Sequence, residues 1–91
     1  MAPIAEPVTD EKVEVQRPWQ VILFNDDWHT FDQVILQVQK ATGCSLEDAT
    51  LITLKAHTDG QAVCFSGPLE RCEIVAGKLQ EIKLNVRIER A

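Results

Sequence analysis

The sequence of 91 residues is poor in positive charge, since nine lysines and arginines face 14 aspartates and glutamates and leave a formal net charge of −5. Phosphate binding needs a basic surface, so this balance argues against nucleic acid as a partner. Long apolar runs are also missing: none approaches the roughly 20 residues that cross a bilayer, and no segment has the pattern of a signal peptide. We therefore expect no nucleic acid and no membrane among the partners.

Cysteine is scarce, and the number of cysteines is odd: they are Cys44, Cys64 and Cys72. No two of them form a Cys-x-x-Cys pair. Neither a disulfide framework nor a zinc ribbon is indicated by this pattern. We interpret the three residues as reduced, mostly buried thiols, which are typical of an intracellular, cytoplasmic protein.

The chain divides into an irregular start and a periodic remainder. Residues 1–17 contain two prolines and many charges without a sustained period, which predicts a flexible N-terminal arm. The remainder has 3.6- and 2-residue periods and no internal repeat. At this length one domain is expected, and we assign it to residues 18–91.

The periodic segments follow the order strand–helix–helix–strand–helix–strand. Apolar or alternating runs at 19–24, 62–65 and 84–88 predict the strands. Helical spacing predicts three helices, which begin near Thr30, Ser45 and Pro68 and end near Gly43, Gly60 and Ile82. Three strands and three helices in so short a domain predict an α+β fold, a small two-layer sandwich with a three-stranded antiparallel sheet.

Local signals support two of the helix starts. Thr30 with Gln33 three residues later has the spacing of a capping box, and Ser45 precedes Asp48 in the same way. In the second helix we expect the leucines at 51 and 54 to widen the buried face.

The polar loop Asn25–His29, "NDDWH", separates the first strand from the first helix. It can be a plain connection, because Asp and Asn favour turns and an Asp near a helix start complements its dipole. It can also be a metal site, in which His57 joins Asp26, Asp27 and His29, because carboxylate and imidazole suit a divalent transition metal. Hydrolysis by a carboxylate pair or a Cys–His couple is a third interpretation, with no nucleophile motif to support it.

A fourth interpretation is the capture of a free amino terminus. An ammonium group offers three donors and one positive charge, so it suits an amide oxygen, a carboxylate and a neutral imidazole nitrogen. Asn25, Asp26 and His57 supply these if the end of the second helix packs beside the loop. Neighbouring apolar residues would then enclose the first side chain, whose burial contributes about 1.5–3 kcal/mol. Spacing alone does not choose among the four interpretations.

Two segments resemble the signature of the ClpS family. "VILFNDDWHTFDQVI" is similar to the family's valine-rich strand followed by N-D-[DE]-x-T-P-M-[DE]-x-V. "EDATLITLKAHTDGQAVC" is similar to its second segment, an A-T-x-x-M-x-x-V-H run followed by G-x-A-x-C. With the last strand, the resemblance covers residues 19–90.

ClpS proteins are adaptors, and the resemblance implies that role here. It implies binding of the N-terminal Leu, Phe, Tyr or Trp of N-degron proteins and peptides. It also implies delivery to the N-domain of a Clp AAA+ unfoldase, of the ClpA or ClpC type, for degradation by ClpP. The family is not enzymatic and needs no cofactor or metal, and we expect a monomer.

The resemblance assigns the amine contacts to Asn25, Asp26 and His57. It places Asp27 against the next part of the peptide, with Trp28 beside it on the rim. It also defines a hydrophobic pocket with a gate, whose positions are His29, Phe31, Val34, Thr53, Ala56 and Leu84.

Several pocket positions depart from the family pattern. His29-Thr30-Phe31 stands where the family has Thr-Pro-Met, so that Phe31 replaces the gate methionine. Thr53 and Ala56 replace a pocket methionine and a pocket valine. Phenylalanine is flat and has fewer torsions than methionine, so we expect a pocket of altered shape.

The surface that faces the unfoldase departs as well. Glu70 and Glu73 match the acids of the family's Glu-x-x-Glu-x-Lys pattern, but Val75 stands where lysine is usual. The third helix is also expected to be shorter than in typical members. These departures allow an alternative function, a Clp-binding regulator that has lost or altered the recognition of N-terminal residues.

Overall fold

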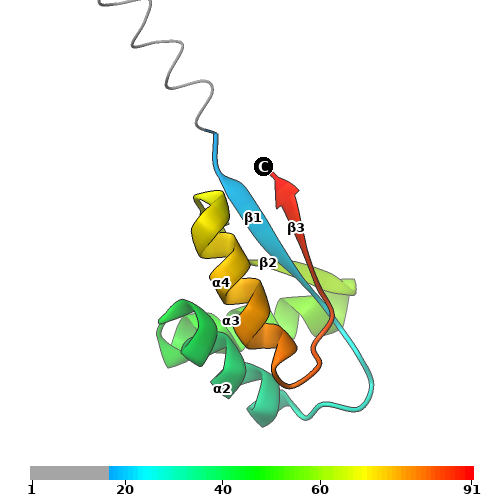
Figure 1. The fold of residues 1–91 in the computed structure, drawn as a ribbon. Helices are drawn as coiled ribbons and strands as arrows, with labels where there is room; N and C mark the ends of the chain where they lie inside the picture. Colours follow the sequence, from blue (N-terminus) through cyan, green and yellow to red (C-terminus); the bar gives the residue numbers. More distant parts are fainter. Residues whose placement is uncertain (1–16) are drawn as a thin grey trace, which may run out of the picture.

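The structure, a computed structural model, describes residues 17–91. Its six elements follow the predicted order: β1 (Trp19–Phe24), α2 (Phe31–Thr42), α3 (Leu46–Asp59), β2 (Gln61–Gly67), α4 (Leu69–Gln80) and β3 (Val86–Arg90) (Figure 1). The predicted α+β class, with three helices and a three-stranded antiparallel sheet, is confirmed. The arm predicted for residues 1–17 lies, except for Arg17, outside the described residues.

The first strand lies in the middle of the sheet, whose order is β2-β1-β3, and it is antiparallel to both neighbours. Val21 pairs with Phe65 and Ile88, whereas Ile22 pairs with Val63. Cys64 is therefore an extra residue in β2, as in a β-bulge. Because β1 is central, the loop that follows it emerges between the other two strands.

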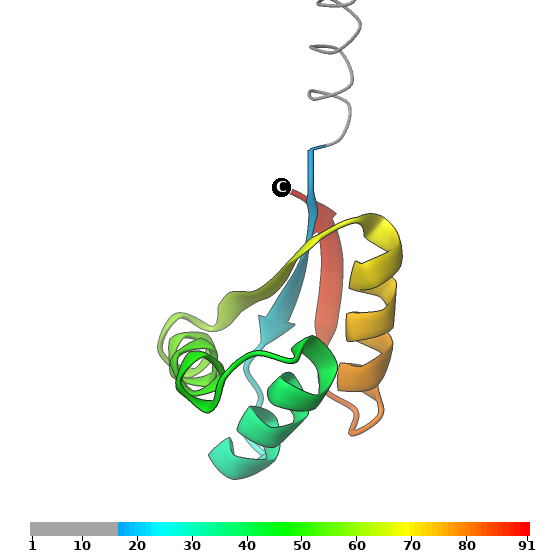
Figure 2. The ribbon, with the colours of Figure 1, turned by 90° about the vertical axis from the view of Figure 1, so that its left-hand side faces the viewer.

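The core lies between the sheet and the helices. α4 packs against all three strands, and α2 packs against α3 and α4. In Figure 2, α4 lies along the sheet, while α2 and α3 lie toward the end where β1 stops. The largest fully buried side chains come from β1, α2 and α4, and they are Leu23, Leu79, Val21, Val38 and Cys72. None of the helices in this part of the chain combines the length and the apolar character that a membrane span requires.

The predicted helix signals hold where they are local. Thr30 and Gln33 form both hydrogen bonds of a capping box at the start of α2. At the start of α3, Ser45 accepts a hydrogen bond from the backbone N–H of Asp48, but no bond from the Asp48 side chain back to Ser45 completes the predicted capping box. Gly43 and Gly60 have positive φ angles of 77° and 88° and end α2 and α3, which is the conformation that glycine adopts at low cost.

The buried face of α3 differs from the expectation. Leu51 and Leu54, expected on the buried side of α3, are 59% and 48% exposed. The buried residues of that helix are the small ones, Ala49, Thr53 and Ala56. α3 therefore packs closely on α2 and β2 through this small-residue face and turns its leucines outward.

α4 also differs in its limits. Pro68 is the N-cap residue rather than the first helical residue, and the helix ends at Gln80 rather than near Ile82. Its buried stripe includes Val75. The extended backbone of Pro68 suits an N-cap, whose φ and ψ are not yet helical.

Candidate functional site

A pocket of about 190 Å³ opens beside the loop that follows β1. Its lining comes from β1 and this loop, from α2 and α3, and from the segment before β3. The lining residues are Leu23, Phe24, Asn25, Asp26, Asp27, His29, Phe31, Val34, Thr53, Ala56, His57 and Leu84. The structure thus brings together all the predicted amine, pocket and gate residues, and Asp27 with them. Leu23 and Phe24 were not predicted, although they directly precede the loop.

The start of the loop is fixed on two sides by backbone hydrogen bonds. The N–H of Phe24 donates to the carbonyl of Asn85 over 2.9 Å, and the N–H of Asn25 donates to the carbonyl of Gly60 over 3.0 Å. Gly60 is the residue that ends α3, and His57 lies in the last turn of that helix. The bond to Gly60 therefore sets Asn25 beside the end of α3 that carries His57.

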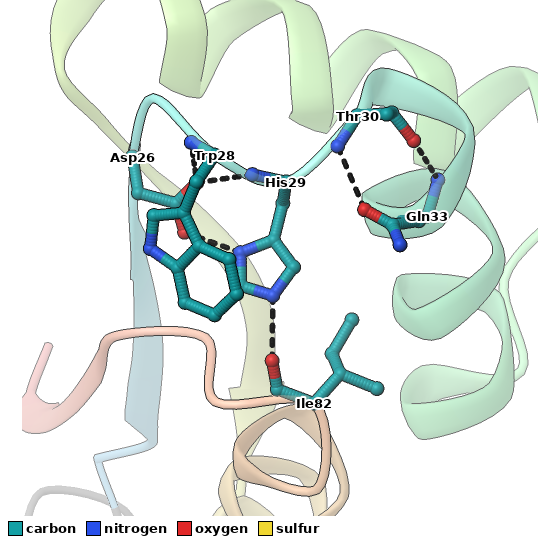
Figure 3. A network of polar contacts seen from close by, with 6 residues as sticks. All are labelled: Asp26, Trp28, His29, Thr30, Gln33 and Ile82. Carbon is teal, nitrogen blue, oxygen red and sulfur yellow. Dashed lines mark hydrogen bonds and ion pairs between the residues drawn. The ribbon is translucent and has the colours of Figure 1, made fainter.

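Asp26 folds back on its own loop (Figure 3). Its Oδ1 atom accepts hydrogen bonds from the backbone N–H groups of Trp28, at 3.1 Å, and of His29, at 2.9 Å. Its Oδ2 atom lies 2.6 Å from Nδ1 of the His29 ring. A carboxylate has about four lone-pair sites. Three are engaged here, so one remains for a ligand.

These contacts change the acidity of Asp26. Burial alone raises the pKa of its carboxyl, but the hydrogen bonds from His29 and Trp28 outweigh burial and hold the pKa below its ordinary value. Asp26 is therefore a carboxylate at neutral pH.

The His29 ring is buried beneath Trp28. Its side chain is 3% exposed, and its Nε2 atom lies 2.5 Å from the carbonyl oxygen of Ile82, which follows α4. The indole of Trp28, itself 66% exposed, covers the ring with a centroid separation of 4.0 Å (Figure 3). The sequence placed His29 in the pocket and gate and Trp28 on the rim. His29 does line the pocket, but its polar atoms face Asp26 and Ile82, and Trp28 is not among the lining residues.

The inner wall of the pocket is apolar. Thr53, Ala56 and Leu84 are each at most 4% exposed. The hydroxyl of Thr53 donates to the carbonyl of Ala49 over 2.8 Å, so its donor is satisfied within α3. On this wall an entering side chain therefore meets hydrocarbon, whereas the polar part of the lining comes mainly from the loop after β1 and from His57.

Phe31 is an exposed residue of the pocket lining. It is 42% exposed and meets the ring of His57 edge-on, at a centroid distance of 5.1 Å and an angle of 70°. The gate predicted at Phe31 and the amine acceptor predicted at His57 are thus in contact with each other.

Leu84 owes its position to the way α4 ends. The N–H of Leu84 donates to the carbonyl of Leu79, and the N–H of Lys83 donates to that of Gln80. Lys83 has a φ angle of 65°. This pairing, with a left-handed residue, is that of a Schellman motif, in which the residue after the turn contacts the helix. Leu79 and Leu84 are both buried accordingly. The sequence assigned Leu84 to the last strand, but β3 begins two residues later.

The metal and hydrolase interpretations gain nothing from the structure. Within residues 17–91, no three His, Cys, Asp or Glu side chains are arranged to hold a metal ion. All three cysteines are free thiols. Burial raises the pKa of the Cys64 thiol to about 12 and also raises that of Cys72, so neither supplies a thiolate nucleophile at neutral pH.

The acids predicted to face the unfoldase lie on α4, away from the pocket lining. Glu70 and Glu73 are exposed, whereas Val75 is 4% exposed and belongs to the core. Replacing lysine by valine at that position therefore adds to the core of this chain rather than to its surface.

A small α+β domain whose apolar pocket opens among polar acceptors is a binding module for an apolar group that carries hydrogen-bond donors. The model of one family, described as "ATP-dependent Clp protease adaptor protein ClpS", matches residues 14–86. The chain belongs to the ClpS family.

Individual proteins are similar to this chain as well. The ATP-dependent Clp protease adapter protein ClpS of Corynebacterium jeikeium is 33% identical over 94 residues, which cover 99% of this chain and 93% of that protein. ClpS of Helicobacter hepaticus is 37% identical over 59 residues, 65% of this chain and 60% of that protein. The human E3 ubiquitin-protein ligase UBR2 is 34% identical over 67 residues, which are 74% of this chain but 4% of that protein.

A solved structure shares the fold. The structure of Agrobacterium tumefaciens ClpS2 bound to L-phenylalaninamide superposes with a TM-score of 0.77 at 20% identity. The match covers 84% of this chain and 99% of that one.

Proposed function

We infer that this protein is an adaptor that binds the free N-terminal hydrophobic residue of N-degron substrates and delivers them to a Clp AAA+ unfoldase for degradation by ClpP. Membership of the ClpS family supports this function. The observation that carries it is the pocket, whose lining combines Asn25, Asp26 and His57 with apolar side chains such as Val34 and Leu84. L-phenylalaninamide, the ligand of the Agrobacterium relative, has a free α-amine and an apolar side chain, as an N-terminal residue does.

The amine is held by three acceptors, one for each of its N–H donors. They are the side-chain oxygen of Asn25, the remaining lone-pair site of Asp26 and a neutral ring nitrogen of His57. His57 is exposed and in aromatic contact with Phe31, so its ring is accessible from the pocket mouth. Asp27, on the same loop, contacts the next part of the peptide.

The side chain of the first residue enters between Phe31 and the small residues of α3. An engineered apolar cavity of about 150 Å³ accepts benzene. A pocket of about 190 Å³ therefore has room for one aromatic or branched aliphatic side chain. Val34 and Leu84 complete the wall, and Thr53 and Ala56 leave space where the family pattern has larger residues. Phe31 sets which side chain is preferred.

Delivery uses a different surface. Glu70 and Glu73, exposed on α4, contact the N-domain of a ClpA- or ClpC-type unfoldase. The adaptor domain comprises residues 18–91 and acts as a cytoplasmic monomer without enzymatic activity or cofactor.

Binding is tested by fluorescence anisotropy with labelled peptides that begin with Leu, Phe, Tyr, Trp, Ile or Val. Each peptide is compared with its N-acetylated form, which lacks the charge and two of the donors. Free peptides of the preferred class bind and acetylated ones do not. Equal binding of the two forms would contradict amine capture.

Delivery is tested by pull-down with the N-domain of each unfoldase and by ClpP-dependent degradation of a reporter with the preferred N-terminal residue. Alanine at Glu70 and Glu73 weakens both, whereas Glu47→Ala, an exposed acid on α3, serves as the matched control and changes neither. Unfoldase binding without any binding of free peptides would instead favour the regulator without N-terminal recognition.

A further inference from the structure

Both ring nitrogens of His29 face hydrogen-bond acceptors. Nδ1 lies 2.6 Å from a carboxylate oxygen of Asp26, and Nε2 lies 2.5 Å from the carbonyl oxygen of Ile82. Figure 3 shows the ring between these two groups, which belong to the loop after β1 and to the segment after α4. The two partners are 56 residues apart in the sequence, so the ring joins segments that have no local connection.

This geometry constrains the hydrogen-bond roles of the two ring nitrogens. A neutral imidazole has one N–H donor and one lone pair, whichever tautomer it adopts. The carbonyl of Ile82 can only accept, so Nε2 must carry a hydrogen. If Nδ1 were then unprotonated, its lone pair would face the carboxylate at 2.6 Å. With Asp26 ionised, only the imidazolium form, which donates from both nitrogens, satisfies both contacts.

Three neighbouring groups present negative charge or electron density to the ring. Asp26 offers a full negative charge in direct contact. The Ile82 carbonyl belongs to the turn that ends α4, and the C-terminal end of a helix carries partial negative charge. Trp28 covers the ring, and the electron-rich face of an indole attracts a cation. The ring is nearly inaccessible to water, so these groups replace its hydration.

We propose that His29 is the positioning residue of the amine site: its imidazolium ties the carboxylate of Asp26 to the end of α4 and so fixes the amine-binding loop against the wall that carries Leu84. The proposal rests on the proposed function, because the loop is positioned for the peptide's amine. His29 uses one lone-pair site of Asp26 and orients the carboxylate, which leaves the last site directed at the ligand. It also makes recognition of the amine depend on the turn Ile82–Leu84.

Three replacements distinguish the effect of the hydrogen-bond donors of His29 from the effect of its volume. His29→Leu fills the space but donates nothing. His29→Gln has two N–H donors without a charge, and His29→Lys has a charge and three donors on a flexible stem. We expect His29→Leu to lower the affinity for a free-amine peptide by about tenfold or more, since hydrogen bonds of charged groups are the strong ones. Glutamine and lysine should each restore part of that loss. Full affinity in His29→Leu would overturn the proposal.

Gln37→Leu is the matched control. The buried side chain of Gln37 donates to the carbonyl of Lys78 over 2.6 Å, so it also ties another element to the end of α4, but it does not line the pocket. Its loss should lower the thermal stability and leave peptide affinity unchanged. If it weakens binding as much as His29→Leu does, general loosening of α4 explains both, and His29 has no specific positioning role.

The protonation of His29 is read in the wild-type protein without peptide, by NMR of ¹⁵N-labelled histidine at pH 7. We expect both ring nitrogens to be protonated in one of the two histidines. The His57→Asn variant, which retains that signal, assigns it to His29. An unprotonated nitrogen in His29 would overturn the proposal even if the variants do not fold. Failure of wild-type protein to bind free-amine peptides would refute the proposed function instead. The NMR result would still decide whether His29 links Asp26 to Ile82.

Discussion

The two histidines of the chain line the same pocket in opposite environments. His57 lies at the end of α3, exposed and in edge-on contact with Phe31. His29 is buried under Trp28, and both of its nitrogens are engaged by groups of the protein. A ring with both nitrogens engaged can position its neighbours but cannot accept a hydrogen bond from a ligand. An exposed ring can accept one. The same side chain therefore serves as support in one place and as a candidate acceptor in the other.

The largest effect is expected from the exposed histidine. His57→Ala removes one acceptor of the ammonium, and a hydrogen bond to a charged group contributes about 1.5–3 kcal/mol. The affinity for a free-amine peptide should fall about 10- to 150-fold, as measured by anisotropy. The unfolding temperature should stay close to that of the wild type, because the ring is exposed. Unchanged affinity would remove the distinction between the two histidines.

The contact of the buried histidine, His29, is tested by changing its partner Asp26. Asp26→Asn converts charge-assisted hydrogen bonds into neutral ones and should lower the free energy of unfolding at pH 7 by about 1–2 kcal/mol. The folded-state pKa of Asp26 is lowered from its ordinary value of 3.8. Its carboxylate therefore stabilises the fold above that value, and the contribution disappears as the pH falls through the folded-state pKa.

Urea unfolding of the wild type and of Asp26→Asn from pH 7 downward measures this effect. The two curves of stability against pH should converge in acid. A difference in stability between the two proteins that stays the same at every pH would show that the carboxylate charge contributes nothing.

A smaller effect is expected at the gate, where Phe31 touches His57. Phe31→Met exchanges a flat ring for an adaptable chain, and swaps of similar volume usually cost less than about 1.5 kcal/mol. The ratio of affinities for peptides beginning with Phe and Leu should change by up to about tenfold, while acetylated peptides stay unbound. An unchanged ratio over the whole peptide series would place the selection elsewhere in the pocket.

The smallest effect concerns the turn that carries Ile82. Lys83 has a positive φ angle of 65°, which disfavours a residue with a Cβ. Lys83→Gly should raise the free energy of unfolding by up to about 1 kcal/mol, less the extra backbone entropy of glycine in the unfolded chain. Chemical denaturation measures the change, and a clear loss of stability would contradict the described turn.

Local signals in the sequence predicted the elements well. The capping box of Thr30 and Gln33, and the helix ends at Gly43 and Gly60, depend on residues within one turn of each other. The end of α4 was placed too late because Lys83 takes a left-handed conformation without the glycine that would announce it. The exposure of Leu51 depends on how α3 packs on β2 and α2, which no local pattern encodes.

The sequence predicted which residues form the site but not the contacts that they make with each other. The family resemblance named Asn25, Asp26 and His57, and all three line one pocket. The bond between His29 and Ile82 had no sequence signal, because its acceptor is a backbone carbonyl 53 positions away and any residue at 82 would present the same group. The sequence therefore predicted that His29 lines the pocket, but not that it also links the loop to the end of α4.

The central claim is that the pocket holds a free α-amine. An NMR titration with a peptide that begins with Phe tests it most directly, by following the side-chain amide of Asn25 and the ring signals of His57. Both should shift on addition of the free peptide and stay unchanged with its acetylated form, while the backbone amides of Glu70 and Glu73 do not respond to either. Equal shifts with both peptides, or shifts confined to α4, would contradict the claim.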